Sequence, residues 1–158
     1  MITRLEADEW ALFRTLRLAA LHDTPDAFSP THAETARHGA DYWMRAARRF
    51  AEEPDRVLLI ARPDLGLMSA VRDDHGIGHI GAMWVAPAAR GQGLGAALLD
   101  AGLRFLEGRG VSVVELSVTE TNTGAMALYR SRGFECTGES EPVRAGSPLA
   151  NLFMRRSG

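Results

Sequence analysis

The sequence predicts a mixed α/β fold, in which helices flank a sheet of mostly antiparallel strands. Helical patterns fill the first third of the 158 residues, a length that suits one domain over residues 1–158. Three strand-like runs with short connections follow between residues 57 and 85, and short connections favour an antiparallel meander. Only one strand–helix–strand unit is present, over residues 78–118, and it adds one parallel pair. The sheet is therefore not expected to be doubly wound.

The first helix is predicted from apolar residues that recur at helical spacing over residues 8–21. We expect a second, short helix over residues 30–38 and a third that begins at an Asp41 cap and reaches Phe50. Residues 2–5 suit a short edge strand. Helices thus dominate the chain before the sheet begins.

Apolar or β-branched runs between turn signals predict the remaining strands, over residues 57–61, 67–71, 78–85, 111–118, 134–137 and 149–155. A helix is expected over residues 96–107, after the third of these runs. Another helix should begin at a cap formed by Thr121 or Asn122 and end at Gly133, where a left-handed residue belongs. The last two strands form a closing pair joined by a loop over residues 139–148.

Composition excludes several classes of function. A net charge of −2 gives no electrostatic reason to expect binding to nucleic acid or to an anionic membrane. The single cysteine, Cys136, allows no intrachain disulfide, and we expect it to be a buried apolar residue. No signal peptide or membrane-length apolar run is present, so a cytoplasmic location is expected. His75 and His79 flank a glycine turn, not a helix, and no metal site is expected.

A glycine-rich turn over residues 90–95 (RGQGLG) joins the third strand to the helix after it. Glycine permits the dihedral angles that aim several backbone N–H groups outward, and a Cβ would obstruct a ligand that lies against the backbone. These donors would meet the positive end of the helix dipole. The turn therefore suits a phosphate or pyrophosphate.

Two motifs resemble those of the GNAT superfamily of N-acetyltransferases. Residues 90–95 match its acetyl-CoA signature, Arg/Gln-x-x-Gly-x-Gly/Ala. Residues 122–134 (NTGAMALYRSRGF) resemble its second signature, Asn-x-x-Ala-x-x-Leu-Tyr-x-x-x-Gly-Phe. One helix and one strand separate the two motifs, as in the family. The match at the level of motifs covers residues 78–134.

The resemblance implies that the two parallel strands splay apart and that acetyl-CoA enters between them. The implied contacts with this co-substrate are Trp84, Val85, Ala86, Arg90, Gly91, Gln92, Gly93, Leu94, Gly95, Ala96, Asn122, Tyr129 and Arg132. Turn amides would hold the pyrophosphate, and strand backbone near residues 84–86 would pair with the pantetheine arm. One N–H there would polarise the thioester carbonyl. Asn122 would bind the arm or order the start of its helix.

The implied reaction is acetyl transfer from acetyl-CoA to a primary amine by direct attack in a ternary complex. Tyr129 would protonate the departing thiolate as general acid. His79 lies where some family members have a carboxylate base, and histidine titrates near neutrality. Glu115 and a chain of water molecules are the alternatives, and His79 could instead be a strand residue bonded to a neighbour.

The family binds its acceptor with the first loop and the late hairpin, and from these regions we select Asp26, Phe28, Trp43 and Arg144 as candidate contacts. The acceptor is expected to be a small-molecule amine, a protein N-terminus or a lysine. Family members are often dimers, which makes a homodimer a further expectation.

Two other functions fit parts of the pattern. A non-catalytic acyl-CoA-binding or sensor module would need the same glycine turn. A dinucleotide-binding unit is the second, because residues 91–96 also fit Gly-x-Gly-x-x-Gly/Ala and Glu115 lies about twenty residues beyond. Four residues separate the strand from Gly91, however, and only one strand–helix–strand unit exists. These two features disfavour a dinucleotide.

Overall fold

The computed structural model describes residues 1–158 as one sheet with helices on both faces. The strands are β1 (Ile2–Arg4), β2 (Arg56–Ala61), β3 (Gly66–Arg72), β4 (Gly78–Val85), β5 (Val113–Thr119), β6 (Glu135–Pro142) and β7 (Ala150–Ser157). The helices are α1 (Trp10–Asp23), α2 (His32–Ala36), α3 (Ala40–Glu52), α4 (Leu94–Glu107) and α5 (Thr123–Ser131). Short 3₁₀ turns η1 (Ala7–Glu9), η2 (Pro25–Ala27) and η3 (Pro87–Ala89) lie between them.

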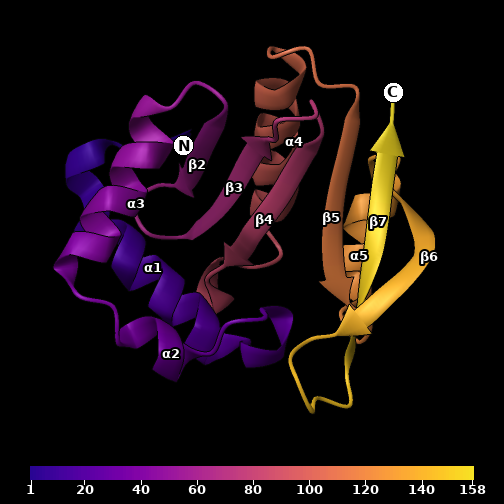
Figure 1. Cartoon of the computed structure of the whole chain (residues 1–158), viewed down its shortest axis with the longest axis horizontal. Coiled ribbons are helices and arrows are strands. Elements are labelled where there is room, and N and C mark those ends of the chain that lie inside the picture. The colour runs from indigo at the N-terminus through magenta and orange to yellow at the C-terminus, as the bar shows by residue number, and fades with distance from the viewer.

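The sheet has the strand order β1-β2-β3-β4-β5-β7-β6 (Figure 1). Strands β1 to β4 are antiparallel neighbours, β4 and β5 are parallel, and β7 pairs antiparallel with both β5 and β6. The predicted mixed sheet with a meander, one crossover and a closing pair is confirmed. None of the helices is long and apolar enough to span a membrane.

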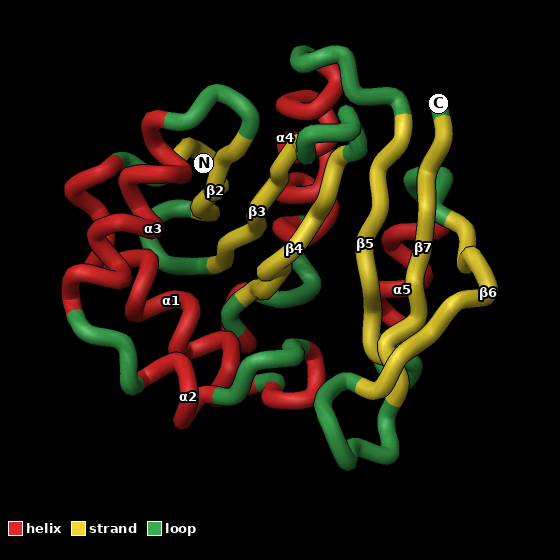
Figure 2. Tube along the Cα trace, viewed as in Figure 1, coloured by secondary structure: helices red, strands yellow, loops and turns green.

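The parallel pair β4–β5 is joined only at one end. Its ladder consists of Gly78 opposite Val114 and His79 opposite Glu115, and then the two strands separate (Figure 2). From residue 80 onward, the edge of β4 that faces β5 has no strand partner. The splayed pair that the family resemblance implies is therefore present.

A bulge in β4 accompanies the divergence. Ser69 lies opposite Gly81 and Leu67 opposite Trp84, so β4 carries one residue more than β3 between these pairs. Ala82 has a φ of +53° and is the one residue other than glycine in the left-handed region. An extra residue bends a strand and reverses which face its later side chains take. The bulge thus bends β4 beside the gap.

Two apolar cores lie on opposite faces of the sheet. One packs α4 and α5 against side chains such as Met68 and Ile80. The other packs α1 and α3 against side chains that include Leu58 and Trp84. Ile80 and Trp84, four residues apart, would share a face of a regular strand, but the bulge places them in different cores. Figure 1 shows α1 and α3 on one side of the sheet and α4 and α5 behind it.

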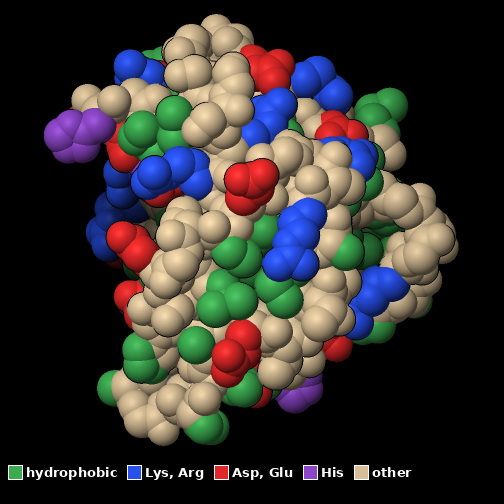
Figure 3. Space-filling view, turned by 90° about the vertical axis from the view of Figure 1, so that its right-hand side faces the viewer, with side chains coloured by type: hydrophobic (Ala, Val, Ile, Leu, Met, Phe, Trp, Pro, Cys, Tyr) green, Lys and Arg blue, Asp and Glu red, His purple; other side chains and the backbone are tan.

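Three expectations for local structure are corrected. Helix α3 begins at Ala40 with Gly39 as its cap, two residues before the expected Asp41 cap. Strand β6 continues to Pro142, well into the expected loop, and every one of its residues is exposed. Cys136, on β6, is therefore exposed and not buried. Figure 3 shows the face at this edge, where acidic and basic side chains are interspersed.

An ion pair between Glu9 and Arg62 fixes the start of α1 to the end of β2. Arg62 donates to both carboxylate oxygens of Glu9, one of them at 2.9 Å, and its Nε donates to Thr3. The hydrogen bond from Arg62 is the main cause that lowers the pKa of Glu9 from 4.5 to about 2. Because the folded-state pKa is depressed, this stabilisation is complete above the unfolded pKa and is lost as the pH falls through the folded pKa.

We therefore expect Glu9→Gln to lower the free energy of unfolding at pH 7 by about 2–3 kcal/mol. Urea unfolding at a series of pH values should show that the deficit shrinks between pH 4.5 and pH 2. Glu52→Gln removes an exposed carboxylate and is the control, with an expected change below about 0.5 kcal/mol. A deficit that stays constant down to pH 2 would show that ionisation of Glu9 is not its cause.

Candidate functional site

A cavity of about 850 Å³ lies where β4 and β5 have separated. The end of β4, the glycine turn, the start of α4, the start of α5 and the loop around η2 line it. Residues of both sequence motifs therefore line the cavity, together with residues 24–27, which follow α1. The cavity is open at the carboxyl ends of both parallel strands.

The glycine turn lies at one side of this cavity and has the backbone geometry that suits an anion. Gly91 and Gly93 have φ values of +79° and +78°, and Gly93 caps α4. An added Cβ would meet nothing within 4 Å at either position, so backbone conformation, and not space, is what favours glycine there. The six N–H groups of residues 91–96 donate to no backbone acceptor, and the first protein bond is from Ala97 to the Gly93 carbonyl at 3.0 Å.

These six donors sit at the positive end of the α4 dipole. An acceptor from a ligand would satisfy them, and a pyrophosphate supplies several oxygens with negative charge. Gly91, Gly93, Leu94, Gly95 and Ala96 line the cavity, as expected, whereas the exposed Gln92 does not. The turn therefore has the geometry and the charge that the sequence predicts for a phosphate site.

The free edge of β4 borders the same cavity. Trp84 and Val85 line it, and the edge beyond residue 79 has no ladder with β5. An exposed strand edge can pair with an extended ligand through backbone hydrogen bonds. Ala86 does not line the cavity, because it has passed the end of β4 and its N–H donates to the Leu65 carbonyl at 2.8 Å. The available edge therefore ends at Val85.

Arg90 holds the end of β4 in place. Its Nε donates to the Val85 carbonyl at 3.0 Å, and its guanidinium also pairs with the Asp23 carboxylate at the end of α1. The same carboxylate accepts a bond from Trp84 Nε1 at 2.9 Å. Hydrogen bonds from Trp84 and then from Arg90 lower the pKa of Asp23. Arg90 lines the cavity, but its guanidinium is committed to Val85 and Asp23.

A second cavity, of about 180 Å³, adjoins the first at the gap between the two strands. The two cavities share Ala27, Met83, Thr119 and Asn122 as lining residues. The smaller one takes residues from both faces of the sheet, with Tyr129 from α5 and Phe28 from the loop after η2. Together the cavities form a path through the sheet, from the glycine turn to the side of α1.

Tyr129 is the titratable group that the second motif contributes to this path. Its side chain is 5% exposed, and burial raises the pKa of its phenol to about 12. The phenol is therefore protonated at neutral pH. Asn122, seven residues earlier, accepts a bond from the Ala125 N–H at 3.2 Å and so caps α5. At the other end Gly133, with φ +89°, allows the Phe134 N–H to reach the Tyr129 carbonyl at 3.1 Å.

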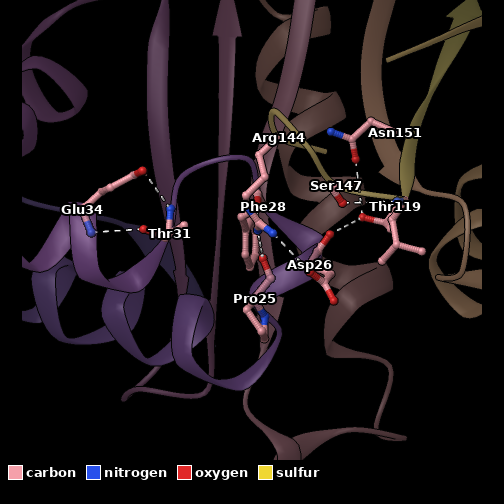
Figure 4. Close-up of polar contacts among 10 residues, drawn as sticks. Pro25, Asp26, Phe28, Thr31, Glu34, Thr119, Arg144, Ser147 and Asn151 are labelled. Atoms are coloured by element: carbon pink, nitrogen blue, oxygen red, sulfur yellow. Dashed lines mark hydrogen bonds and ion pairs between the residues drawn. The ribbon is translucent and has the colours of Figure 1, made fainter. Parts of the chain in front are cut away.

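The loop before α2 is tied to the late hairpin beside the cavities (Figure 4). Arg144 donates to the carbonyls of Pro25 at 2.7 Å and of Phe28 at 3.0 Å, and lies 3.3 Å from a carboxylate oxygen of Asp26. Thr119 at the end of β5 donates to the Asp26 carbonyl at 2.6 Å. Of the acceptor candidates, Phe28 borders the small cavity and Asp26 the larger one, while Arg144 holds the loop.

Several expected site residues lie elsewhere. His79 is exposed at the paired end of β4, with Nε2 at 2.8 Å from Asp73, and it lines neither cavity. Glu115, opposite it, pairs with Arg155 at 2.9 Å. These positions do not fit a general base, because neither side chain borders the gap where the strands separate. The parallel ladder itself keeps this end of the pair closed.

Trp43 and Arg132, which were expected to contact the acceptor and acetyl-CoA, also lie outside the two cavities. Trp43 is 1% exposed and packs edge-on against Phe13, so it belongs to the core and not to an acceptor surface. Arg132 binds Asp100 with two hydrogen bonds, of 2.9 and 3.0 Å, and thereby joins the end of α5 to α4. It lines neither cavity. Both side chains hold elements of the fold together and border neither cavity.

Sequence reasoning missed Arg17 of α1, which lines the small cavity. A signal existed: Arg17 follows Phe13 by four residues and precedes Ala20 and Leu21, so a charged residue interrupts the apolar face of the helix. No group of three or more His, Cys, Asp or Glu side chains could hold a metal ion. Apart from Tyr129, the chemistry of the small cavity therefore rests on hydroxyl, amide, guanidinium and backbone groups.

Comparison with known proteins identifies the family. The model of the acetyltransferase (GNAT) family matches residues 18–134. A mycothiol acetyltransferase of Stackebrandtia nassauensis is 37% identical over 123 residues, which cover 73% of this chain and 38% of that protein. A mycothiol acetyltransferase of Thermobispora bispora is 36% identical, over 75% of this chain and 40% of its own length. The chain thus spans about two fifths of these relatives.

Solved structures show the same fold. A GNAT acetyltransferase of Streptococcus pneumoniae superposes with a TM-score of 0.86 at 18% identity, covering all of this chain and 99% of its own. The YncA protein of Salmonella typhimurium, determined with acetyl-CoA as its cofactor, has a TM-score of 0.80 at 20% identity, over 99% and 92% of the two chains. The chain belongs to the acetyltransferase (GNAT) family.

Proposed function

We propose that this protein transfers the acetyl group of acetyl-CoA to a primary amine, by direct attack of the amine in a ternary complex. The observation that carries the proposal is that the glycine turn, the free edge of β4 and Tyr129 all border two adjoining cavities. An anion site, a site for an extended arm and a buried acid thus follow one another along a single path through the sheet.

The chain's backbone would do most of the binding. The N–H groups of residues 91–96 would hold the pyrophosphate, and the edge of β4 at Trp84 and Val85 would take the pantetheine arm as an added strand. An N–H of β4 beside the Ala82 bulge would polarise the thioester carbonyl. Bound acetyl-CoA supplies the activated acetyl group at the gap.

Tyr129 would act as the general acid. Its phenol keeps its proton at neutral pH because its pKa is about 12, and the thiolate that leaves the carbonyl carbon is the group that needs a proton. The Asn122 cap and the Gly133 turn fix the two ends of α5, which supports the position of Tyr129. The acid is thus held by the second motif, and the anion site by the first.

The proton of the attacking amine would leave through water. No histidine, aspartate or glutamate lines the small cavity, so the open mouth of the larger cavity is the route for that proton. We therefore favour the water chain over His79 and Glu115 as the base. This choice follows from their place at the closed end of the β4–β5 pair.

His79→Gln is accordingly expected to keep kcat/KM within about threefold of the wild type, since the side chain touches no part of the path. Steady-state rates at several pH values provide the measurement. A loss of about 100-fold or more, with disappearance of the acidic limb of the pH profile, along which the rate rises as a base loses its proton, would reinstate His79 as the base.

The proposal is tested by release of the CoA thiol from acetyl-CoA over a panel of amino acids, polyamines, aminoglycosides and short peptides. Protein-only controls correct for the exposed thiol of Cys136. Release with one class of amine, and an acetylated amine in the product, supports an N-acetyltransferase. Binding of acetyl-CoA by calorimetry with no turnover of any amine would instead support a non-catalytic acyl-CoA-binding module.

A further inference from the structure

We propose that Arg17 binds a carboxylate of the acceptor, so that the acceptor is a small amine with an acidic group close to the nitrogen, such as an amino acid. This inference rests on the proposed function and names the acceptor class for it. It follows from the surroundings of one arginine in the small cavity.

Arg17 is half-buried and has no hydrogen-bond or ion-pair partner in the protein. Its Nη1 has no exposed surface and no hydrogen-bond partner, and no carboxylate lies within ion-pair distance. Its neighbour is the ring of Phe28, whose centroid is 4.6 Å from the guanidinium carbon. Burial lowers the pKa of Arg17. A buried charge without a counter-charge is costly, and the cost is recovered when an anion binds.

Other arginines near the site already bind groups of the protein. Arg90 pairs with Asp23, and Arg144 binds two carbonyls and Asp26. Arg17 is the only charged side chain that lines the small cavity, and no acidic side chain lines it. The cavity therefore carries a net positive charge, which would attract an anionic group and repel a simple cationic amine.

The position of Arg17 also fits an amine next to a carboxylate. Arg17 borders the cavity from α1, on one side of the sheet, and Tyr129 borders it from α5, on the other. A guanidinium binds a carboxylate with two parallel hydrogen bonds and so fixes its direction as well as its charge. The volume of about 180 Å³ holds about six water molecules, which suits a small acceptor and not a folded protein.

The test compares amino acids with their primary amides, which keep the amine and remove the negative charge. For the wild type we expect kcat/KM to be about 100-fold or more higher for the acid than for its amide. Arg17→Met should collapse this ratio to near one, chiefly by raising KM for the acid. Arg17→Lys should restore part of it, because lysine keeps the charge but loses the fork of donors.

Arg14→Met is the matched control, because Arg14 lies three residues earlier on α1, is exposed and makes no ion pair or hydrogen bond. It should leave the ratio unchanged. A merely structural role of Arg17 would lower turnover of acid and amide alike and keep their ratio. Equal turnover of acids and amides by the wild type would overturn the inference while the acetyltransferase stands. Turnover of no amine at all would overturn both.

Discussion

Replacing Tyr129 by Phe is expected to lower kcat by about 10²–10⁴-fold, with the acetyl-CoA Kd within about threefold of the wild type. The substitution removes only the phenolic hydroxyl, and the ring keeps its packing against Phe134, whose centroid is 6.0 Å away. Because burial is the only cause that shifts the pKa of Tyr129, the hydroxyl is not needed to satisfy a partner in the protein. The fold should therefore survive.

Tyr42→Phe is the matched control for this variant, since Tyr42 is the other of the two tyrosines and lies exposed on α3. Its turnover should equal that of the wild type. Thiol-release rates give kcat, and calorimetry gives the Kd for acetyl-CoA. Wild-type turnover by Tyr129→Phe would remove this phenol from the mechanism and leave protonation of the thiolate to solvent.

Gly91→Asp is expected to weaken acetyl-CoA binding by about 100-fold or more, because it places a negative charge beside the N–H groups that would hold the pyrophosphate. Aspartate tolerates a left-handed conformation better than most residues, and an added Cβ meets nothing within 4 Å at this position. The main effect should therefore be electrostatic, and calorimetry at two salt concentrations should show that salt reduces it.

Gly110→Asp controls for the strain of the substitution. Gly110 has a φ of +75°, close to the +79° of Gly91, and it too has no atom within 4 Å of an added Cβ. It lies beyond the end of α4, at the opposite end of the helix from the anion site. Both variants should lose similar stability, but only Gly91→Asp should lose affinity. Equal affinities in the two variants would remove the glycine turn as the pyrophosphate site.

The parts of the fold that the sequence predicts are those with local causes. The apolar run at residues 57–61 lies between turn signals and predicts a buried strand, and Gly133 favours a left-handed turn at the end of α5. Strand β6 was predicted too short because all its residues are exposed, and its pairing depends on β7. Gly81 lies beside the bulge, but the left-handed residue is Ala82, a residue type that does not favour this conformation, so the way β4 bends could not be predicted.

In the candidate site, too, the features with a local sequence cause were predicted and the others were not. The anion site and Tyr129 lie within short motifs whose spacing fixes their geometry. The acceptor side is built from segments far apart in sequence, as in the contacts of Arg144 with Pro25 and Phe28, and no local pattern reports them. His79 was misplaced because residue order along a strand does not show where two parallel strands begin to separate.

Direct attack in a ternary complex is tested most directly by initial rates measured over a grid of acetyl-CoA and amine concentrations. The geometry predicts intersecting double-reciprocal lines, since the two cavities adjoin and both substrates would be bound when the bond forms. Parallel lines, together with an acetylated form of the protein in the absence of amine, would contradict it and show that a side chain carries the acetyl group.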